Sequence, residues 1–147
     1  MKKQPAIASV PTGTLTVLSI GPLDDDHLPL EAIIRHTTWR LFQAHNLASA
    51  IALLQQHEIA VVLCERDLQP GTWLDVLERL HGLPGSPSLI VTSRLADDRL
   101  WVEALNLGVW DVLAKPFDRN EVIRSVKSAW QSWHDRTTAR NAMAAAS

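Results

Sequence analysis

The sequence is poor in several features that would point to particular classes of protein. It contains a single cysteine, Cys64, so no internal disulfide can form, which is typical of a reducing compartment. No apolar run approaches the roughly 18 residues that would suggest a membrane span. The formal net charge is -2, so no general field attracts the chain to nucleic acid or anionic lipid. We therefore expect a cytoplasmic protein that binds neither nucleic acid nor membrane.

Motifs for metals and cofactors are also missing. The six histidines are dispersed, with no HxxxH or CxxC pattern, which predicts no metal site. The stretch "SIGPLDDD" after the first apolar run lacks the glycines of a phosphate-binding loop. Cys64 lies inside the run "IAVVLC", where it is expected to pack as a small buried hydrophobe. These absences predict no resident cofactor and no enzymatic activity. A small cofactor-binding enzyme is a minor alternative.

What is present is an alternation of two patterns along 147 residues. Apolar runs typical of strands occupy residues 14–20, 39–44, 59–64, 88–93 and 110–115. Amphipathic stretches typical of helices occupy about 28–36, 47–57, 72–82, 97–108 and 118–136. The alternation predicts one α/β domain over residues 14–135, with a five-stranded parallel sheet doubly wound by helices. Residues 1–13 are expected to form a flexible arm, and residues 136–147 a flexible tail.

Three polar side chains of complementary type stand where predicted strands end. Glu65 follows the third strand, Thr92 closes the fourth, and Lys115 closes the fifth. Because function in parallel sheets collects at the carboxyl ends of the strands, we expect these three side chains to meet. The acids Asp24–Asp26 lie before a predicted helix, where exposed N–H groups and the helix dipole favour negative charge.

The run "ALNLGVWDVLAKPFDRNEV", residues 104–122, is similar to the Gly-Ala-x-Asp-x-hydrophobic-x-Lys-Pro-Phe run of response regulator receiver domains. The resemblance covers about Leu15 to Trp133. It implies a flavodoxin-like fold with strand order 2-1-3-4-5 and a role in two-component, phosphorelay-type signalling. The implied partner is a histidine kinase or a downstream signalling protein.

In that family, an Asp after the third strand accepts a phosphoryl group, a Thr or Ser contacts its oxygens, and a Lys pairs with it. Thr92 and Lys115 match these positions, but the phosphoacceptor position falls on Glu65. The longer side chain of Glu moves its oxygens by roughly 1 Å, a misplacement that can cost about a hundredfold in rate. Glu65 is therefore expected to act as a fixed anion facing Lys115, or simply to form an ion pair that stabilises the fold.

Two further family positions are changed. The acid pair that holds Mg²⁺ is replaced by Gly21 and Pro22, and the switch aromatic is replaced by Val112. These departures predict a stand-alone pseudo-receiver that uses no Mg²⁺ and acts by protein–protein contacts. No helix-turn-helix segment follows the last predicted helix, so we expect no DNA-binding output.

One alternative keeps the phosphorylation chemistry. Asp67, two residues beyond Glu65, could accept the phosphoryl group from a histidine kinase if the third strand runs longer. Asp24–Asp26 would then approach as ligands of Mg²⁺. The simpler interpretation places Asp67 in a solvated loop.

The chain has six tryptophans, and several are expected to pack in or near the core. Four of them are expected to share the side formed by the fourth helix, fifth strand and fifth helix: Trp101, Trp110, Trp130 and Trp133. In receiver domains this side is a common dimer or output surface. An aromatic cluster there predicts a protein interface, with a homodimer as one possibility.

Overall fold

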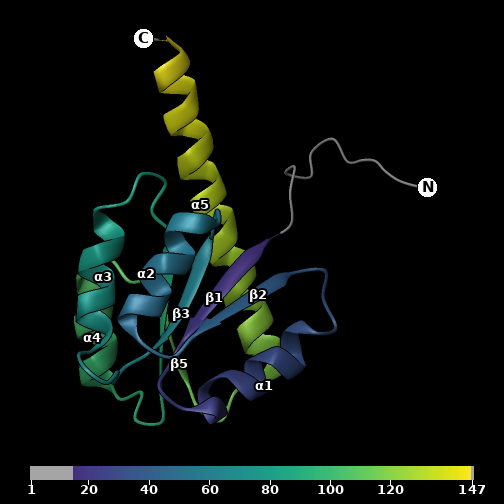
Figure 1. The fold of residues 1–147 in the computed structure, drawn as a ribbon, viewed down its shortest axis with the longest axis vertical. Helices are drawn as coiled ribbons and strands as arrows, with labels where there is room; N and C mark the ends of the chain where they lie inside the picture. The colour runs from purple at the N-terminus through teal and green to yellow at the C-terminus, as the bar shows by residue number, and fades with distance from the viewer. Residues whose placement is uncertain (1–14, 147) are drawn as a thin grey trace.

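The computed structural model describes residues 15–146, so the arm predicted for residues 1–13 lies outside the described residues. Strands and helices alternate strictly along the chain (Figure 1). The strands are β1 (Thr16–Ile20), β2 (Arg40–Ala44), β3 (Val61–Glu65), β4 (Ser88–Ser93) and β5 (Asp111–Ala114). The helices are α1 (Asp24–Ile34), α2 (Leu47–Gln56), α3 (Trp73–His81), α4 (Asp98–Asn106) and α5 (Arg119–Ala146).

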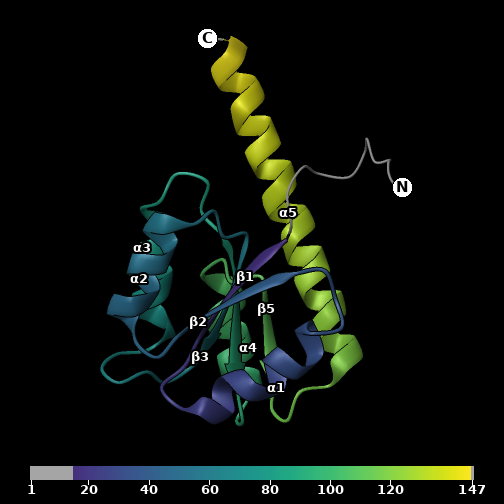
Figure 2. The ribbon, with the colours of Figure 1, turned by 45° about the vertical axis from the view of Figure 1, so that its right-hand side comes forward.

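The five strands form one parallel sheet in the order β2-β1-β3-β4-β5, which confirms the predicted topology. Figure 2 shows the sheet with helices packed on its two sides. All strands run in one direction, so their carboxyl ends share one edge of the sheet. The register aligns Glu65 of β3 with Thr92 of β4, and Ser93 with Ala114 of β5. The loops that follow β1, β3, β4 and β5 therefore meet at this edge.

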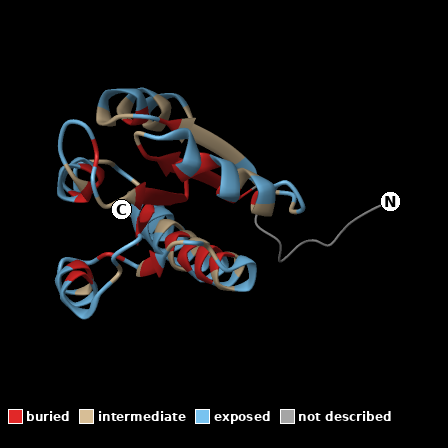
Figure 3. Ribbon diagram, turned by 90° about the horizontal axis from the view of Figure 1, so that it is seen from below, coloured by how far each residue is buried: buried red, intermediate tan, exposed pale blue. Residues whose placement is uncertain are grey.

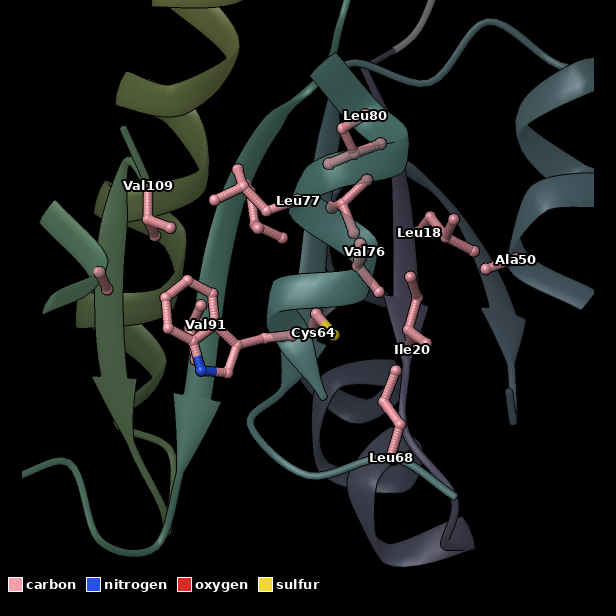
Figure 4. Close-up of a cluster of buried hydrophobic side chains, with 14 of the residues drawn as sticks. Leu18, Ile20, Ala50, Cys64, Leu68, Val76, Leu77, Leu80, Val91 and Val109 are labelled. Atoms are coloured by element: carbon pink, nitrogen blue, oxygen red, sulfur yellow. The ribbon is translucent and has the colours of Figure 1, made fainter. Parts of the chain in front are cut away.

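Successive apolar residues of β1, β3 and β4 alternate between two apolar layers, as the pleat requires. One layer packs under α2, α3 and α4, and Figure 4 shows part of it, with Leu18, Cys64 and Val91 pointing toward α3 and its neighbours. The other layer packs under α1 and α5 and includes Val17 and Leu63. In Figure 3 the buried residues lie along the strands and on the inward sides of the helices. Apolar runs without alternation are what a sheet covered on both faces needs.

Helix ends follow local signals in the sequence. Asp97 caps α4 by accepting a hydrogen bond from the N–H of Leu100 at 2.9 Å. Gly108 follows α4 with φ of 95°, a conformation that favours glycine. The Thr72 side chain caps α3.

Helix α5 differs from the prediction at its end. The sequence pattern predicts a helix that ends near residue 136 and a flexible tail beyond it, whereas α5 continues to Ala146. The physical reason is that residues 137–146 contain neither glycine nor proline and are rich in alanine, the best helix former. Figures 1 and 2 show these last turns projecting beyond the other elements. Within residues 15–146, no helix combines the length and apolar character needed to cross a membrane.

Candidate functional site

The carboxyl edge of the sheet gathers polar side chains from separate loops. Glu65 is the last residue of β3, and the N–H of the next residue, Arg66, donates to the carbonyl of Thr92 at 2.8 Å. Lys115 follows β5, and its N–H donates to the carbonyl of Ser93 at 3.0 Å. These backbone bonds extend the ladder past the strand ends. They fix the backbone positions of Glu65 and Lys115 relative to β4.

The three side chains expected to meet at this edge are brought together. The Lys115 ammonium lies 2.6 Å from Oε2 of Glu65, and the Thr92 hydroxyl donates to the same oxygen at 3.3 Å. A second carboxylate completes the cluster, since Oδ1 of Asp26 lies 2.5 Å from the Lys115 ammonium. The Lys115 and Asp26 side chains are only 10% and 9% exposed, and Glu65 is 16% exposed. We call Asp26, Glu65, Thr92 and Lys115 the rim cluster.

Asp26 reaches Lys115 because the loop after β1 is tight. The second carboxylate oxygen of Asp26, Oδ2, accepts a hydrogen bond from the N–H of Leu23 at 2.9 Å, so both oxygens of Asp26 are bound. A Cβ atom at Gly21 would lie 2.6 Å from both Cβ and Oδ2 of Asp26. Only a residue without a side chain therefore lets the first turn of α1 approach β1 this closely.

The place of Asp26 in the rim cluster is not predicted from the sequence. The sequence predicts charge at a helix start or, in the alternative hypothesis, ligands of Mg²⁺ for Asp24–Asp26, and neither role includes a contact with Lys115. The spacing of the three acids on the first helical turn was the available signal, because consecutive helical residues point about 100° apart. Only one of the three can face the sheet.

The other acids of the alternative hypothesis lie elsewhere. The side chain of Asp67 is 66% exposed and pairs with Arg66 at 3.1 Å, and the backbone of Asp67 bridges to Thr72. Asp24 pairs with His45 at 3.1 Å and is 85% exposed. Asp67 thus occupies the solvated loop of the simpler interpretation, away from the rim cluster.

Mg²⁺, which the resemblance to receiver domains implies, does not fit the residues at this edge. The two carboxylates of the rim cluster, Asp26 and Glu65, are both bound to the Lys115 ammonium. Gly21 and Pro22 offer no side-chain oxygen. Among residues 15–146, no group of three or more His, Cys, Asp or Glu side chains is arranged to hold a metal ion.

Cys64 lies directly beneath the cluster, in the core layer under α3 (Figure 4). Burial raises the pKa of its thiol well above the usual range, and the negative charges of Glu65 and Asp26 act in the same direction. A thiol in this environment stays protonated and is a poor nucleophile.

The four tryptophans predicted for an interface do not share one exposed side. Trp101 and Trp110 are 44% and 40% exposed, and the indole of Trp110 donates to Ser128 on α5 at 2.9 Å. Trp133, by contrast, is buried in the layer between α5 and the sheet, and its indole donates to the carbonyl of Gly85 at 3.0 Å. Trp130 is half-buried and packs against the same layer.

Helical spacing explains why Trp133 does not belong to the predicted interface. It falls four residues after Ala129 and seven after Val126, on the stripe of α5 that faces the sheet.

Comparisons with known proteins agree with this architecture. The family model described as "Response regulator receiver domain" matches residues 23–127. The photosynthetic apparatus regulatory protein RegA of Rhodovulum sulfidophilum is 29% identical over 109 residues, covering 72% of this chain and 60% of RegA. The transcriptional regulatory protein KdpE of Mycobacterium tuberculosis (strain H37Rv) is 29% identical over 110 residues, covering 73% of this chain and 48% of KdpE. The chain thus spans about half of the length of these curated relatives.

Solved structures share the fold. The signal receiver domain of an HD domain-containing protein from Pseudomonas fluorescens Pf-5 superposes with a TM-score of 0.76 at 22% identity, covering 84% of this chain and 99% of that one. The signal receiver domain of a LuxO repressor protein from Vibrio parahaemolyticus gives a TM-score of 0.78 at 16% identity, covering 86% of this chain and 97% of that one. With the strand order, the lysine after β5 and the matched family model, the chain belongs to the response regulator receiver domain family of two-component signalling.

Proposed function

We propose that this chain is a receiver-type signalling module whose carboxyl edge is held in one arrangement by its own charges. In this proposal Glu65 replaces the phosphoacceptor, and the module signals through protein contacts without phosphorylation, Mg²⁺ or catalytic activity. The observation that carries the proposal is the ion pairing of Lys115 with both Glu65 and Asp26.

The charge balance of the cluster supports this proposal. A phosphoryl group carries about −1.5 to −2 charge at neutral pH, and two carboxylates present a comparable charge to Lys115. Buried charges of opposite sign in close contact are costly to separate, so the arrangement resists rearrangement. The loss of an aromatic residue at Val112, which is buried in β5, fits a site that is not required to toggle.

Phosphotransfer assays test the proposal directly. Wild type, Glu65→Asp and Asp67→Asn are incubated with acetyl phosphate and Mg²⁺, and intact mass spectrometry measures the addition of a phosphoryl group. A receiver with a complete acid pair serves as the positive control. We expect no addition to wild type, and none to Glu65→Asp, because no acid pair stands after β1 to hold the metal.

The outcomes separate the two functional hypotheses. Robust phosphorylation of Glu65→Asp would overturn the claim that the metal site is missing. Phosphorylation of wild type that disappears in Asp67→Asn would establish the alternative, a working response regulator that uses Asp67. Labelling that survives in Asp67→Asn would point to another acceptor and would equally refute the proposal.

The contact surface proposed for this module is the exposed apolar part of α4 and the turn after it. Four side chains there are 40–59% exposed: Trp101, Val102, Leu107 and Trp110. Large apolar side chains on one side of a protein favour partner binding, and tryptophan is enriched at the centre of interfaces. Two of the four tryptophans predicted from the sequence thus remain in the proposal.

A homodimer is the version of this contact that can be tested without knowing a partner. Sedimentation equilibrium compares wild type with Trp101→Glu and with Leu74→Glu, a control at an apolar residue on α3 that is similarly exposed. Self-association that is lost in Trp101→Glu and kept in Leu74→Glu supports the α4 surface. A wild type that stays monomeric at high concentration removes the homodimer and leaves a different protein as the partner.

A further inference from the structure

His27, on the first turn of α1, is buried against the carboxyl end of β1 with only 2% exposure. Both of its ring nitrogens are bound. Nε2 lies 2.8 Å from the carbonyl oxygen of Gly21, and Nδ1 lies 2.8 Å from the hydroxyl of Ser19, which is itself 1% exposed. The ring therefore joins α1 to Ser19 of β1 and to Gly21 in the loop that follows β1.

These contacts place a hydrogen on one ring nitrogen. A carbonyl oxygen only accepts hydrogen bonds, so Nε2 must carry a hydrogen, and the Ser19 hydroxyl can then donate to a bare Nδ1. Burial lowers the pKa of His27, which favours this neutral form. The hydrogen bond to the Gly21 carbonyl acts in the other direction and raises the pKa, as do the charges of Asp26 and Asp24. His45, from the loop after β2, lies edge-on with ring centroids 4.8 Å apart and also lowers the pKa of His27.

The residue before His27 is the carboxylate that binds Lys115. Asp26 and His27 share the same helical turn, so the position of the ring fixes where the Asp26 side chain starts. The first turn of α1 packs so closely on Gly21 that a side chain at Gly21 would clash with Asp26. Gly21 also provides the carbonyl that accepts the bond from His27.

From this geometry we propose that neutral His27 is a positioning residue, which fastens the first turn of α1 to β1 and thereby presents Asp26 to Lys115. This role is separate from the proposed function. It concerns where one carboxylate of the rim cluster lies, and it holds whether or not Glu65 or Asp67 can be phosphorylated.

The reactivity of Lys115 toward acetic anhydride, measured by peptide mass spectrometry, reports on its pairing with Asp26. In wild type we expect slow acetylation relative to Lys127, an exposed lysine on α5. His27→Leu removes both hydrogen bonds of the ring and should raise the Lys115 rate by roughly tenfold, the effect of losing a buried hydrogen bond. His27→Gln retains an N–H that can reach Gly21 and should stay near the wild-type rate. His36→Gln, at an exposed histidine, is the matched control.

Two patterns of acetylation would overturn the proposal. Lys115 that stays as slow in His27→Leu as in wild type would show that Asp26 needs no fastening. Equal increases in His27→Leu and His27→Gln would show that the shape of the ring matters and its hydrogen bonds do not.

A second measurement needs no variant and so does not depend on a variant folding. Nitrogen-15 NMR of the histidine rings distinguishes a ring that is protonated only at Nε2 from the other tautomer and from the doubly protonated form. We expect His27 of the wild-type protein to be protonated only at Nε2 at neutral pH. An Nδ1–H tautomer or an imidazolium would refute the assignment of donors and acceptors, and with it the proposal.

Discussion

Lys115 and Glu65 lie in contact across the end of β4, with the ammonium nitrogen 2.6 Å from Oε2 of the carboxylate. They come from two strands that are not neighbours, and the strand between them contributes Thr92 to the same oxygen. The positions of both residues are thus set by the strand order of the sheet. Asp26 joins the pair from the first turn of α1, the helix that follows β1 at the same edge of the sheet.

Removing the cation of this cluster should be costly. Lys115→Met leaves two buried carboxylates close together without their counter-charge, and we expect the free energy of unfolding in urea to fall by about 3–5 kcal/mol. Adding Glu65→Gln and Asp26→Asn to Lys115→Met should restore a large part of that loss. Lys127→Met, on the exposed side of α5, is the control and should stay within about 0.5 kcal/mol of wild type. A Lys115→Met variant as stable as wild type would contradict the buried pairing.

A methyl group at Gly21 should disturb the cluster from the other side. In Gly21→Ala the new Cβ would lie 2.6 Å from Asp26, so α1 must shift or the side chain must leave Lys115. We expect a loss of about 1–3 kcal/mol in urea unfolding, typical of overpacking. Gly82→Ala is a matched control, because its Cβ would meet nothing closer than 3.6 Å. Similar stabilities for the two variants would argue against the tight approach.

The stability of the protein should depend on the charge state of His27. Its pKa is lowered in the folded protein from the ordinary value of 6.5, chiefly by burial. Below about pH 6.5 the unfolded chain binds a proton that the folded chain binds less readily, so the free energy of unfolding falls as the pH drops toward the folded pKa. Above pH 6.5 this contribution is complete and constant.

The measurement is urea unfolding of wild type and His27→Gln from pH 8 to pH 5, since the difference between them isolates this ring from the other histidines. The slope of the difference should not exceed about 1.4 kcal/mol per pH unit. A difference that is independent of pH, or one that grows as the pH falls, would contradict a depressed pKa.

Trp133 should behave as a core residue. Trp133→Ala removes a buried indole between α5 and the sheet and should cost about 3–5 kcal/mol. Trp101→Ala, at an exposed position on α4, should change the stability of the monomer by about 0.5 kcal/mol or less. Chemical unfolding followed by circular dichroism measures both. Equal effects at the two positions would restore the predicted surface location of Trp133.

Much of the fold could be predicted from the sequence because each strand is a short apolar run and each helix carries one apolar stripe. The site was harder, since it depends on loop geometry. Glu65, Thr92 and Lys115 stand at strand ends, so the parallel topology alone brings them near one another. Asp26 stands six residues past β1, and its contact with Lys115 depends on how closely α1 approaches Gly21, which no periodicity encodes.

The C-terminal turns of α5 extend beyond the rest of the domain, so a small tilt of the helix produces a larger displacement at its end. Trp133 and Arg136 attach the helix to the loop before β4: the Trp133 indole donates to the carbonyl of Gly85, and the Arg136 guanidinium donates to the carbonyl of Ser86 at 3.2 Å. The ten residues after Arg136 add about 15 Å to the helix axis, so tilting the helix by about 10° at Arg136 would move its C-terminal end by about 3 Å. A small shift of β4 and the loop before it, with the sheet unchanged, would thus cause a larger displacement at the C-terminal end of α5.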